Sequence, residues 1–304
     1  MRFSPLFWPI ELKNNKIYIL DETALPHQVN YIEASNYEQA CLAIKEMKTR
    51  AVGQVLLVMY TFLLEAAKGT DLNMVSEAIN AARPTLPFKV LTDMVLGWVK
   101  SGAPIDKSIL GFLEGLKAKR IQQAEEASKL INDKDVILTH CNVSGLMPLI
   151  ADFCKEQNKS ISFFVTETRP YLQGMRLTVW ELQEAGYQAT IICDNMVAQV
   201  MAEGRINKVI VGADHLALNG DIANKIGTYQ IAILARQFRI PFYVLCPPPS
   251  KAATGAQIKI EIRPENEILE FGGKLIAPKG ARAYYPAFDV TPNEFITQHV
   301  YLKI

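Results

Sequence analysis

The sequence predicts an α/β fold, in which a mainly helical N-terminal domain with a small antiparallel sheet precedes a doubly wound parallel sheet. Two observations support this. Between residues 37 and 131 the apolar residues follow helical spacing, and from Asp135 onward short apolar runs alternate with helical segments. Continuous apolar runs separated by helices indicate a parallel sheet that is buried on both faces. The change of rhythm predicts two domains, 1–130 and 131–304.

The N-terminal domain opens with a predicted hairpin. In PIELKNNKIYIL (9–20), two strand-like runs flank the turn Lys13-Asn14-Asn15-Lys16. From Tyr37, NYEQACLAIKEMK spaces its apolar residues as a helix does. The segment 51–68 is strongly apolar, but it contains Gln54 and ends in charge, so it is interpreted as a buried helix. Further helices are predicted at 71–82, from near Pro84, and over about 108–131.

The C-terminal domain alternates strands and helices. Strands are predicted at 136–140, 160–165, 189–193, 208–213 and 242–246, with helices at 144–157, 173–186, 195–203 and 223–238. In such a sheet, ligands bind beyond the carboxyl ends of the strands. The first four strands are followed by His140-Cys141-Asn142, Glu167-Thr168-Arg169, Asp194-Asn195 and Asp214. These residues predict one convergent polar site.

Two residues of this edge are candidates for chemistry. Cys141 lies where a strand meets a helix, and a helix N-terminus can support a thiolate. The alternative is a packing role, which is also the expectation for Cys41, Cys154, Cys193 and Cys246. Asp214 directly follows a buried strand, so it is either a buried proton donor or acceptor, or a cap.

Other polar residues are candidates for binding an anion. Asn224 and Lys225 are expected on the first turns of the 223–238 helix, with Asp221 as its cap, and a helix N-terminus favours anions. Arg50 and Arg83 each precede a helical segment, where an arginine either reaches an anion or lies at the surface. His140 is interpreted as a structural histidine, because adjacent strand residues point to opposite faces.

Bulk properties exclude several classes of function. The net charge is +1, which disfavours nucleic acid or an anionic membrane as a partner. Five cysteines without a CxxC pair disfavour disulfides or a zinc site and predict a cytoplasmic protein. The N-terminus has no secretion-signal pattern.

There is no P-loop, no GxGxxG and no serine nucleophile elbow, so no metal or other cofactor is expected. A cysteine, an aspartate and nearby cations suit proton transfer on a phosphorylated small molecule.

At these positions the sequence resembles the methylthioribose-1-phosphate isomerases. Their superfamily includes the ribose-1,5-bisphosphate isomerases and the regulatory subunits of initiation factor 2B. The blocks that carry the resemblance are PIELKNNKIYILDETALP (9–26), LTHCN (138–142), TETRPYLQGMRLTVWEL (166–182), CDNM (193–196), VGADHLALNGDIANKIGTYQIA (211–232), IPFYV (240–244) and YPAFDVTP (285–292). They occur in order over most of the chain.

The resemblance implies a helical N-terminal domain with a small sheet, a Rossmann-like C-terminal domain and a homodimer. It also implies that Cys141 and Asp214 are the catalytic pair. The residues that it implies for sugar-phosphate binding are Arg50, Arg83, Gln173, Asn224 and Lys225. The implied activity is an aldose–ketose isomerase of methionine salvage, which converts 5-methylthioribose 1-phosphate to the ketose 1-phosphate.

Two motifs depart from the isomerase pattern. RAVG (50–53) stands where the isomerases typically have RGAP, and RPTLPFK (83–89) where they have RPTAVNL. After LTHCN, the segment NVSGLMP leads into a shortened helix that contains Pro148. These departures leave three alternatives open: a 5-deoxyribose-1-phosphate isomerase, a ribose-1,5-bisphosphate isomerase, or a non-catalytic sensor of sugar phosphates or nucleotides like the initiation factor 2B subunits.

Overall fold

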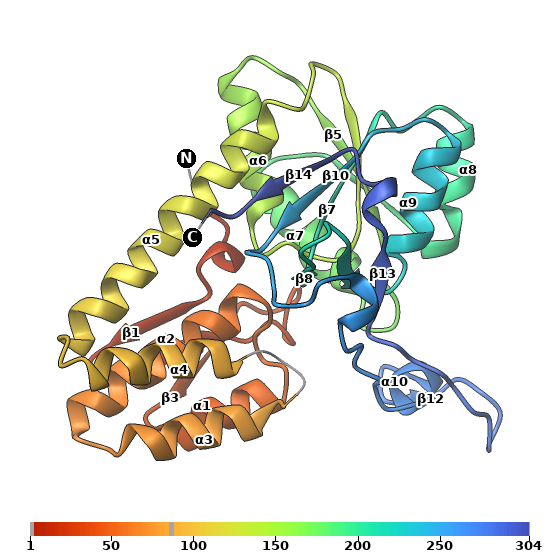
Figure 1. The fold of residues 1–304 in the computed structure, drawn as a ribbon. Helices are drawn as coiled ribbons and strands as arrows, with labels where there is room; N and C mark the ends of the chain where they lie inside the picture. Colours follow the sequence, from red (N-terminus) through yellow and green to blue (C-terminus); the bar gives the residue numbers. More distant parts are fainter. Residues whose placement is uncertain (1–2, 85–87, 304) are drawn as a thin grey trace. The chain divides into compact units, whose positions relative to one another are not determined.

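A computed structural model describes residues 3–84 and 88–303 of the chain. These residues form two compact units, which are described separately (Figure 1). Unit 1 comprises Met1–Ile121 with Ser144–Leu146, and unit 2 comprises Gln122–Val143 with Met147–Lys303. The division falls within one long helix, α5 (Ile105–Ser128). The domain boundary at residue 130 stays a prediction.

Unit 1 contains the antiparallel sheet. After a short 3-10 turn, η1 (Pro5–Phe7), strands β1 (Ile10–Lys13) and β2 (Lys16–Leu20) pair with Lys13 opposite Lys16. Asn14 and Asn15 between them have φ of 49° and 56°, which is the left-handed conformation that a two-residue hairpin turn requires. The predicted hairpin is confirmed. A third strand, β3 (Tyr31–Ala34), pairs with β2 and was not predicted.

The helices of unit 1 lie close to their predicted ranges. They are α1 (Tyr37–Lys45), α2 (Val52–Lys68), α3 (Leu72–Ala82), α4 (Phe88–Lys100) and the N-terminal part of α5. The side chains of Asn36 and Asp71 cap α1 and α3 by accepting backbone N–H groups. Most residues of α2 are buried, including Gln54, as expected for a helix that is apolar around most of its surface. Among the described helices, none is long and apolar enough to cross a membrane.

Unit 2 is built on a parallel sheet of six strands in the order β14-β10-β7-β4-β5-β6 (Figure 1). The five predicted strands are confirmed as β4 (Val136–Thr139), β5 (Ser162–Thr166), β6 (Ala189–Ile192), β7 (Lys208–Gly212) and β10 (Phe242–Cys246). The sixth, β14 (Gln298–Tyr301), extends the sheet beside β10. The predicted fold class is therefore confirmed.

Helices cover this sheet. Apolar side chains of α8 (Val197–Ala202) and α9 (Thr228–Gln237) share one buried cluster with β4, β7 and β10. Unit 2 also contains α6 (Leu146–Glu156), with Pro148 in its first turn, and α7 (Val179–Glu184). A π-helical turn, η2 (Gly174–Thr178), leads directly into α7. Gln123 in the last part of α5 donates to the carbonyls of Cys246 and Val300, at 3.0 and 2.7 Å.

The predicted helix 223–238 is wrong in its first part. Its place is taken by β9 (Ile222–Lys225), which pairs with β8 (His215–Leu216) and with β13 (Phe288–Thr291). The helix α9 begins only after Gly227, whose φ is +105°. Residues 222–225 form a strand because they pair with β13, which lies more than 60 residues further along the chain. The local sequence pattern therefore does not reveal this strand.

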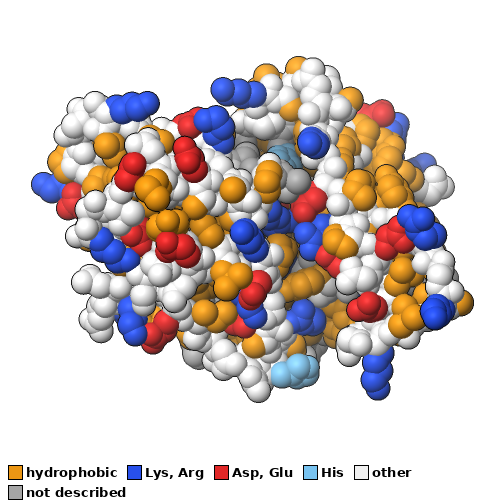
Figure 2. Space-filling model, turned by 90° about the horizontal axis from the view of Figure 1, so that it is seen from below, with side chains coloured by type: hydrophobic (Ala, Val, Ile, Leu, Met, Phe, Trp, Pro, Cys, Tyr) orange, Lys and Arg blue, Asp and Glu red, His pale blue; other side chains and the backbone are white. Residues whose placement is uncertain are grey.

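The remaining elements lie between β10 and β14. They are η4 (Gly255–Gln257), α10 (Asn266–Leu269), the short hairpin β11 (Glu270–Phe271) with β12 (Lys274–Leu275), and η5 (Asn293–Phe295). Figure 2 shows acidic and basic side chains interspersed on one face of the molecule. This distribution agrees with the nearly balanced 32 basic and 31 acidic residues.

Candidate active site

Cys141 and Asp214 follow neighbouring strands of the parallel sheet. β4 ends at Thr139 and β7 ends at Gly212, so each residue lies two positions beyond its strand. The register places Ile137 opposite Lys208, and continuing it by four residues brings Cys141 level with Gly212. A Cβ atom on Gly212 would lie only 2.8 Å from Val143 Cγ1, so the loop after β4 contacts the end of β7. The predicted convergence at this edge is therefore seen for β4 and β7.

The backbone of Cys141 is held on both sides. Its φ is +64°, which is uncommon for a residue with a side chain. Its N–H donates to Thr168 Oγ1 at 2.9 Å, and its carbonyl accepts from Thr178 Oγ1 at 2.6 Å. The residue is 9% exposed.

Asp214 is exposed, so of its two interpretations, a buried proton donor or acceptor and a cap, the burial assumed in the first is wrong. The chain has already left β7 at this point, and the Asp214 N–H donates to Ala223 O at 2.9 Å. This bond joins the start of the β8 hairpin to β9. The carboxylate of Asp214 is thus at the surface, two residues beyond the buried strand.

His140 is a structural histidine, as expected. It is 1% exposed, and its two ring nitrogens lie 2.6 Å from Thr166 Oγ1 and 2.9 Å from Ile226 O. Burial lowers the pKa of His140, which keeps the ring neutral. Since Nε2 must then donate to the carbonyl, Nδ1 accepts from the threonine. The ring therefore ties the end of β4 to the turn after Lys225.

Asn224 and Lys225 are buried on β9, at 5% and 8% exposure, and not on a helix as predicted. Asn224 Nδ2 donates to Thr228 Oγ1 at 2.9 Å, and that hydroxyl donates to Lys225 O at 2.7 Å. Lys225 is therefore not a solvated surface lysine. The prediction that Asp221 caps the helix after it is wrong, since α9 begins after Gly227. Its carboxylate accepts from the N–H groups of Gly255 and Asn293, both at 2.9 Å.

Gln173 is buried beside the end of β5. It is 3% exposed, and within the described part of the chain no hydrogen-bond partner reaches its Oε1. The next residue, Gly174, packs so closely that an added Cβ would lie 1.9 Å from Thr166 O. A buried amide oxygen without a partner costs free energy, and a hydroxyl group of a ligand would satisfy it.

Asp289 on β13 is a site-adjacent residue that the sequence analysis did not single out. Its carboxylate accepts from Gly227 N at 2.7 Å and from Tyr229 N at 3.1 Å. Burial raises the pKa of Asp289 to about 6, although these two N–H groups and the charge of Lys225 act to lower it. The acidic residue in YPAFDVTP was a visible signal, but only the β9–β13 pairing brings it beside Lys225.

Two other residues at this edge, Asp194 and Arg169, make hydrogen bonds to other parts of the chain. The Asp194 carboxylate accepts from the N–H groups of Thr168 and Arg169, at 2.8 and 2.7 Å. The Arg169 guanidinium donates to Ile268 O at 3.2 Å and lies 5.4 Å from the Phe271 ring centroid. Asp194 therefore shapes the loop after β5, while Arg169 anchors the segment around α10.

Arg50 and Arg83 belong to unit 1, whereas the other five candidates belong to unit 2. Arg50 Nε lies 2.9 Å from Glu22 Oε2, and the Arg50 N–H donates to Oε1 of the same carboxylate. Ala51, which follows, has φ +46° and ψ −119° at the start of α2. Arg83 ends α3 and contacts Met47 Sδ at 2.9 Å. The altered motif 83–89 continues into residues 85–87, outside the described residues.

The other four cysteines have environments that suit packing. Burial raises the pKa of Cys41 and Cys154 to about 11 and that of Cys246 to about 12. The negative charge of Glu167 raises the pKa of Cys193. These thiols stay protonated at neutral pH, as expected for residues that are not nucleophiles.

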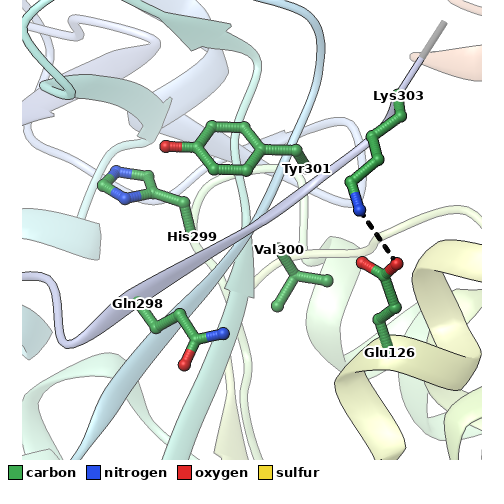
Figure 3. Close-up of a pocket in the computed structure, with 6 residues that line it drawn as sticks. All are labelled: Glu126, Gln298, His299, Val300, Tyr301 and Lys303. Carbon is green, nitrogen blue, oxygen red and sulfur yellow. Dashed lines mark hydrogen bonds and ion pairs between the residues drawn. The ribbon is translucent and has the colours of Figure 1, made fainter.

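One cavity lies beside the edge strand β14. It measures about 500 Å³ and is lined by Glu126 of α5 together with Gln298, His299, Val300, Tyr301 and Lys303 of the β14 segment (Figure 3). Lys303 Nζ lies 3.1 Å from Glu126 Oε1 across it. No candidate site residue lines it. Among residues 3–84 and 88–303, no group of three or more His, Cys, Asp or Glu side chains could hold a metal ion.

The fold defines a Rossmann-like α/β protein, a class in which ligands bind beyond the carboxyl ends of the strands. The chain belongs to the initiation factor 2 subunit family, whose model matches residues 57–300.

Relatives are similar over nearly the whole chain. The methylthioribose-1-phosphate isomerase 1 of Pseudothermotoga lettingae is 38% identical over 93% of this chain and 90% of its own. The methylthioribose-1-phosphate isomerase of Desulforudis audaxviator is 37% identical over 98% and 92%.

Two solved structures share the fold closely. The 5-methylthioribose 1-phosphate isomerase of Pyrococcus horikoshii superposes with a TM-score of 0.84 and 29% identity, over 98% of this chain and 93% of its own. The translation initiation factor eIF-2B subunit delta of A. fulgidus superposes with a TM-score of 0.80 and 31% identity, over 97% and 94%.

Proposed function

We propose that the protein is an aldose–ketose isomerase of methionine salvage that converts 5-methylthioribose 1-phosphate to the ketose 1-phosphate. The observation that carries the proposal is the placement of Cys141 and Asp214 two residues beyond the ends of adjacent strands, where the loop after β4 contacts the end of β7. Relatives that share more than a third of their residues over nearly the full chain are isomerases of this substrate.

The reaction sets two chemical requirements. Because C1 of the substrate carries phosphate, the closed ring has no free aldehyde to enolise, so a proton must first reach the ring oxygen. Hydrogen must then move from C2 to C1. The exposed carboxyl of Asp214 can exchange protons with solvent and serves the ring oxygen and the C2 hydroxyl. The thiol of Cys141, at 9% exposure, is its acid/base partner.

Binding roles follow from charge and hydrogen-bonding capacity. Lys225 and Asn224, both buried on β9, contact the sugar phosphate, and the Oε1 of Gln173 accepts from a sugar hydroxyl. Arg50 and Arg83 of unit 1 contribute positive charge for the phosphate.

The test of the chemistry is turnover by purified protein. Incubation with 5-methylthioribose 1-phosphate should yield the ketose, and Cys141→Ala and Asp214→Asn should each lower kcat by about 100-fold or more. Cys41→Ala, which removes a buried thiol from α1, should keep kcat within about twofold and serves as the matched control. Unchanged turnover in either active-site variant would refute the mechanism.

The C5 substituent is tested by a substrate panel. The methylthio, 5-deoxy and 5-phosphate forms of ribose 1-phosphate are compared by kcat/KM, since they differ only at C5. The proposal requires the methylthio sugar to be preferred. A higher value for the 5-deoxy sugar or the bisphosphate would reassign the substrate.

A second candidate function is a non-catalytic sugar-phosphate or nucleotide sensor. The likeness to the eIF-2B delta subunit and the altered RAVG motif favour it. Micromolar binding of the panel without turnover by any member would support the sensor over the enzyme.

The cellular setting belongs to the same proposal. Five free cysteines, four of them buried, suit a reducing cytoplasm. The partner molecules are the sugar phosphate and a second copy of the chain, with no nucleic acid or membrane. The exposed apolar side chains of Phe271, Leu275 and Ile276 at the β11–β12 hairpin are the kind of surface that association covers.

A further inference from the structure

The conformation of Cys141 needs support from its surroundings. A left-handed backbone costs a residue with a Cβ roughly 1–2 kcal/mol. Cys141 has φ +64°, and Ser144 in the same loop has φ +52°. Since the backbone sets the direction of the Cα–Cβ bond, whatever holds this peptide also restricts the positions that the sulfur can take.

Two threonine hydroxyls hold it from opposite sides. Thr168, after β5, accepts the Cys141 N–H at 2.9 Å, and Thr178, at the end of η2, donates to the Cys141 carbonyl at 2.6 Å. Both threonines are fully buried. The two bonds come from different elements, so together they fix the peptide planes before and after the Cys141 Cα.

Each of the two threonine hydroxyls both donates and accepts a hydrogen bond. Thr168 Oγ1 lies 3.3 Å from Thr166 O and 3.4 Å from Thr166 Oγ1. Because the Thr166 hydroxyl donates to His140, Thr168 donates to Thr166 in either case and presents a lone pair to the Cys141 N–H. Thr178 donates to Cys141 O and accepts from Asn142 Nδ2 at 3.0 Å. Valine, which has the same shape without the hydroxyl, would remove these bonds with little change in volume.

Each threonine is itself held in place. The Asp194 carboxylate binds the Thr168 N–H at 2.8 Å, and this holds a residue whose own φ is +63°. Thr178 is placed by the π-helical turn, whose first residue, Gly174, lies against Thr166 O. π-Helical turns are rare and occur frequently at functional sites. The surrounding structure therefore fixes both hydroxyls before any ligand binds.

We propose that Thr168 and Thr178 are positioning residues that hold Cys141 in its reactive orientation. This inference rests on the proposed isomerase function and adds two residues to its site. Neither threonine touches the substrate in this proposal, so their loss should affect the chemical step more than binding.

The experiment compares Thr178→Val and Thr168→Val with Thr178→Ser. Each valine variant should lower kcat by about 10- to 100-fold with KM changed less than about threefold, because a small misplacement of a reacting group is costly. Thr178→Ser restores the hydroxyl and should restore kcat to within about threefold of the unchanged protein. The control is Thr61→Val, which removes another buried hydroxyl that donates to a backbone carbonyl, at 2.7 Å in α2.

A second readout does not need turnover. Iodoacetamide labelling of Cys141, followed by mass spectrometry, should be about threefold or more faster in the valine variants, because a released backbone exposes the thiol. Labelling in Thr178→Ser and Thr61→Val should match the unchanged protein. If no substrate is turned over, the proposed function fails while labelling still tests the positioning. Unchanged kcat and labelling in both valine variants, or a serine variant as impaired as Thr178→Val, would overturn the inference.

Discussion

Lys225 is a buried cation whose surroundings come from distant parts of the chain. Its Nζ lies 4.6 Å from the centroid of the Phe288 ring on β13, and the Asp289 carboxylate is an electrostatic neighbour. The adjacent carbonyl, Ile226 O, accepts from His140. A buried lysine with this support is a pre-placed positive charge for an anion, which is the role proposed for it.

Asp289 should make stability depend on pH. Its pKa is about 6 in the folded chain against the usual 3.8, so between these values the folded chain holds a proton that the unfolded chain has lost. The stability that Asp289 contributes is thus present at low pH and falls as pH rises through this window. Urea unfolding should show the advantage of the unchanged protein over Asp289→Asn shrinking by about 1–3 kcal/mol between pH 4 and 7. An advantage that grows with pH would contradict this.

Gln173→Leu should separate stability from activity. Removing a buried amide oxygen that lacks a partner should leave the free energy of unfolding unchanged or higher. Losing one hydrogen bond to the sugar should lower kcat/KM by about 5- to 30-fold, equivalent to about 1–2 kcal/mol. Urea unfolding and steady-state kinetics give both values. Unchanged kcat/KM would remove Gln173 from the substrate site.

Among the elements, η2 is the one most constrained by close packing. Gly174→Ala would bring a Cβ to 1.9 Å from Thr166 O, and backbone atoms must move to relieve such a contact. We expect a loss of about 1–3 kcal/mol in the free energy of unfolding, measured with urea. Gly111→Ala in α5 is the control, because nothing lies within 4 Å of its added Cβ. Equal stability of the two variants would show that η2 tolerates the extra methyl.

The start of α2 carries strain that a glycine would relieve. Ala51 has φ +46° and ψ −119°, a conformation that only glycine adopts readily. In Ala51→Gly, relief of the strain stabilises the folded chain, while the larger entropy of glycine stabilises the unfolded chain. The net effect should be a rise of about 1 kcal/mol in the free energy of unfolding. Ala66→Gly, inside the same helix, should instead lower the free energy of unfolding by about 1 kcal/mol. Thermal unfolding of both variants checks this.

For the whole molecule, the proposed homodimer is tested by measuring the molar mass in solution. The exposed apolar side chains around β11 and β12 would be covered in an assembly. Light scattering at micromolar concentration should give twice the chain mass of 34.0 kDa. A mass of one chain across this concentration range would reject the homodimer.

The sequence predicted the elements that have strong local patterns. Five strands of the parallel sheet were visible as apolar runs, and α1 to α5 as helical spacing. β14 was missed because only Val300 of its four residues is buried, so it shows no apolar run. β9 was taken for a helix because its strand pairing is made by β8 and β13 and not by its own residue pattern.

By itself, the sequence determined the α/β class and the position of Cys141 and Asp214 directly beyond strands, because burial imposes a local periodicity. Only the tertiary structure decided that Asp214 is exposed, that Lys225 is buried on a strand, and that Thr168 and Thr178 hold Cys141. Exposure and hydrogen-bond partners depend on which distant segments meet. A hydroxyl that binds a carbonyl 37 residues away leaves no periodic signal in the chain.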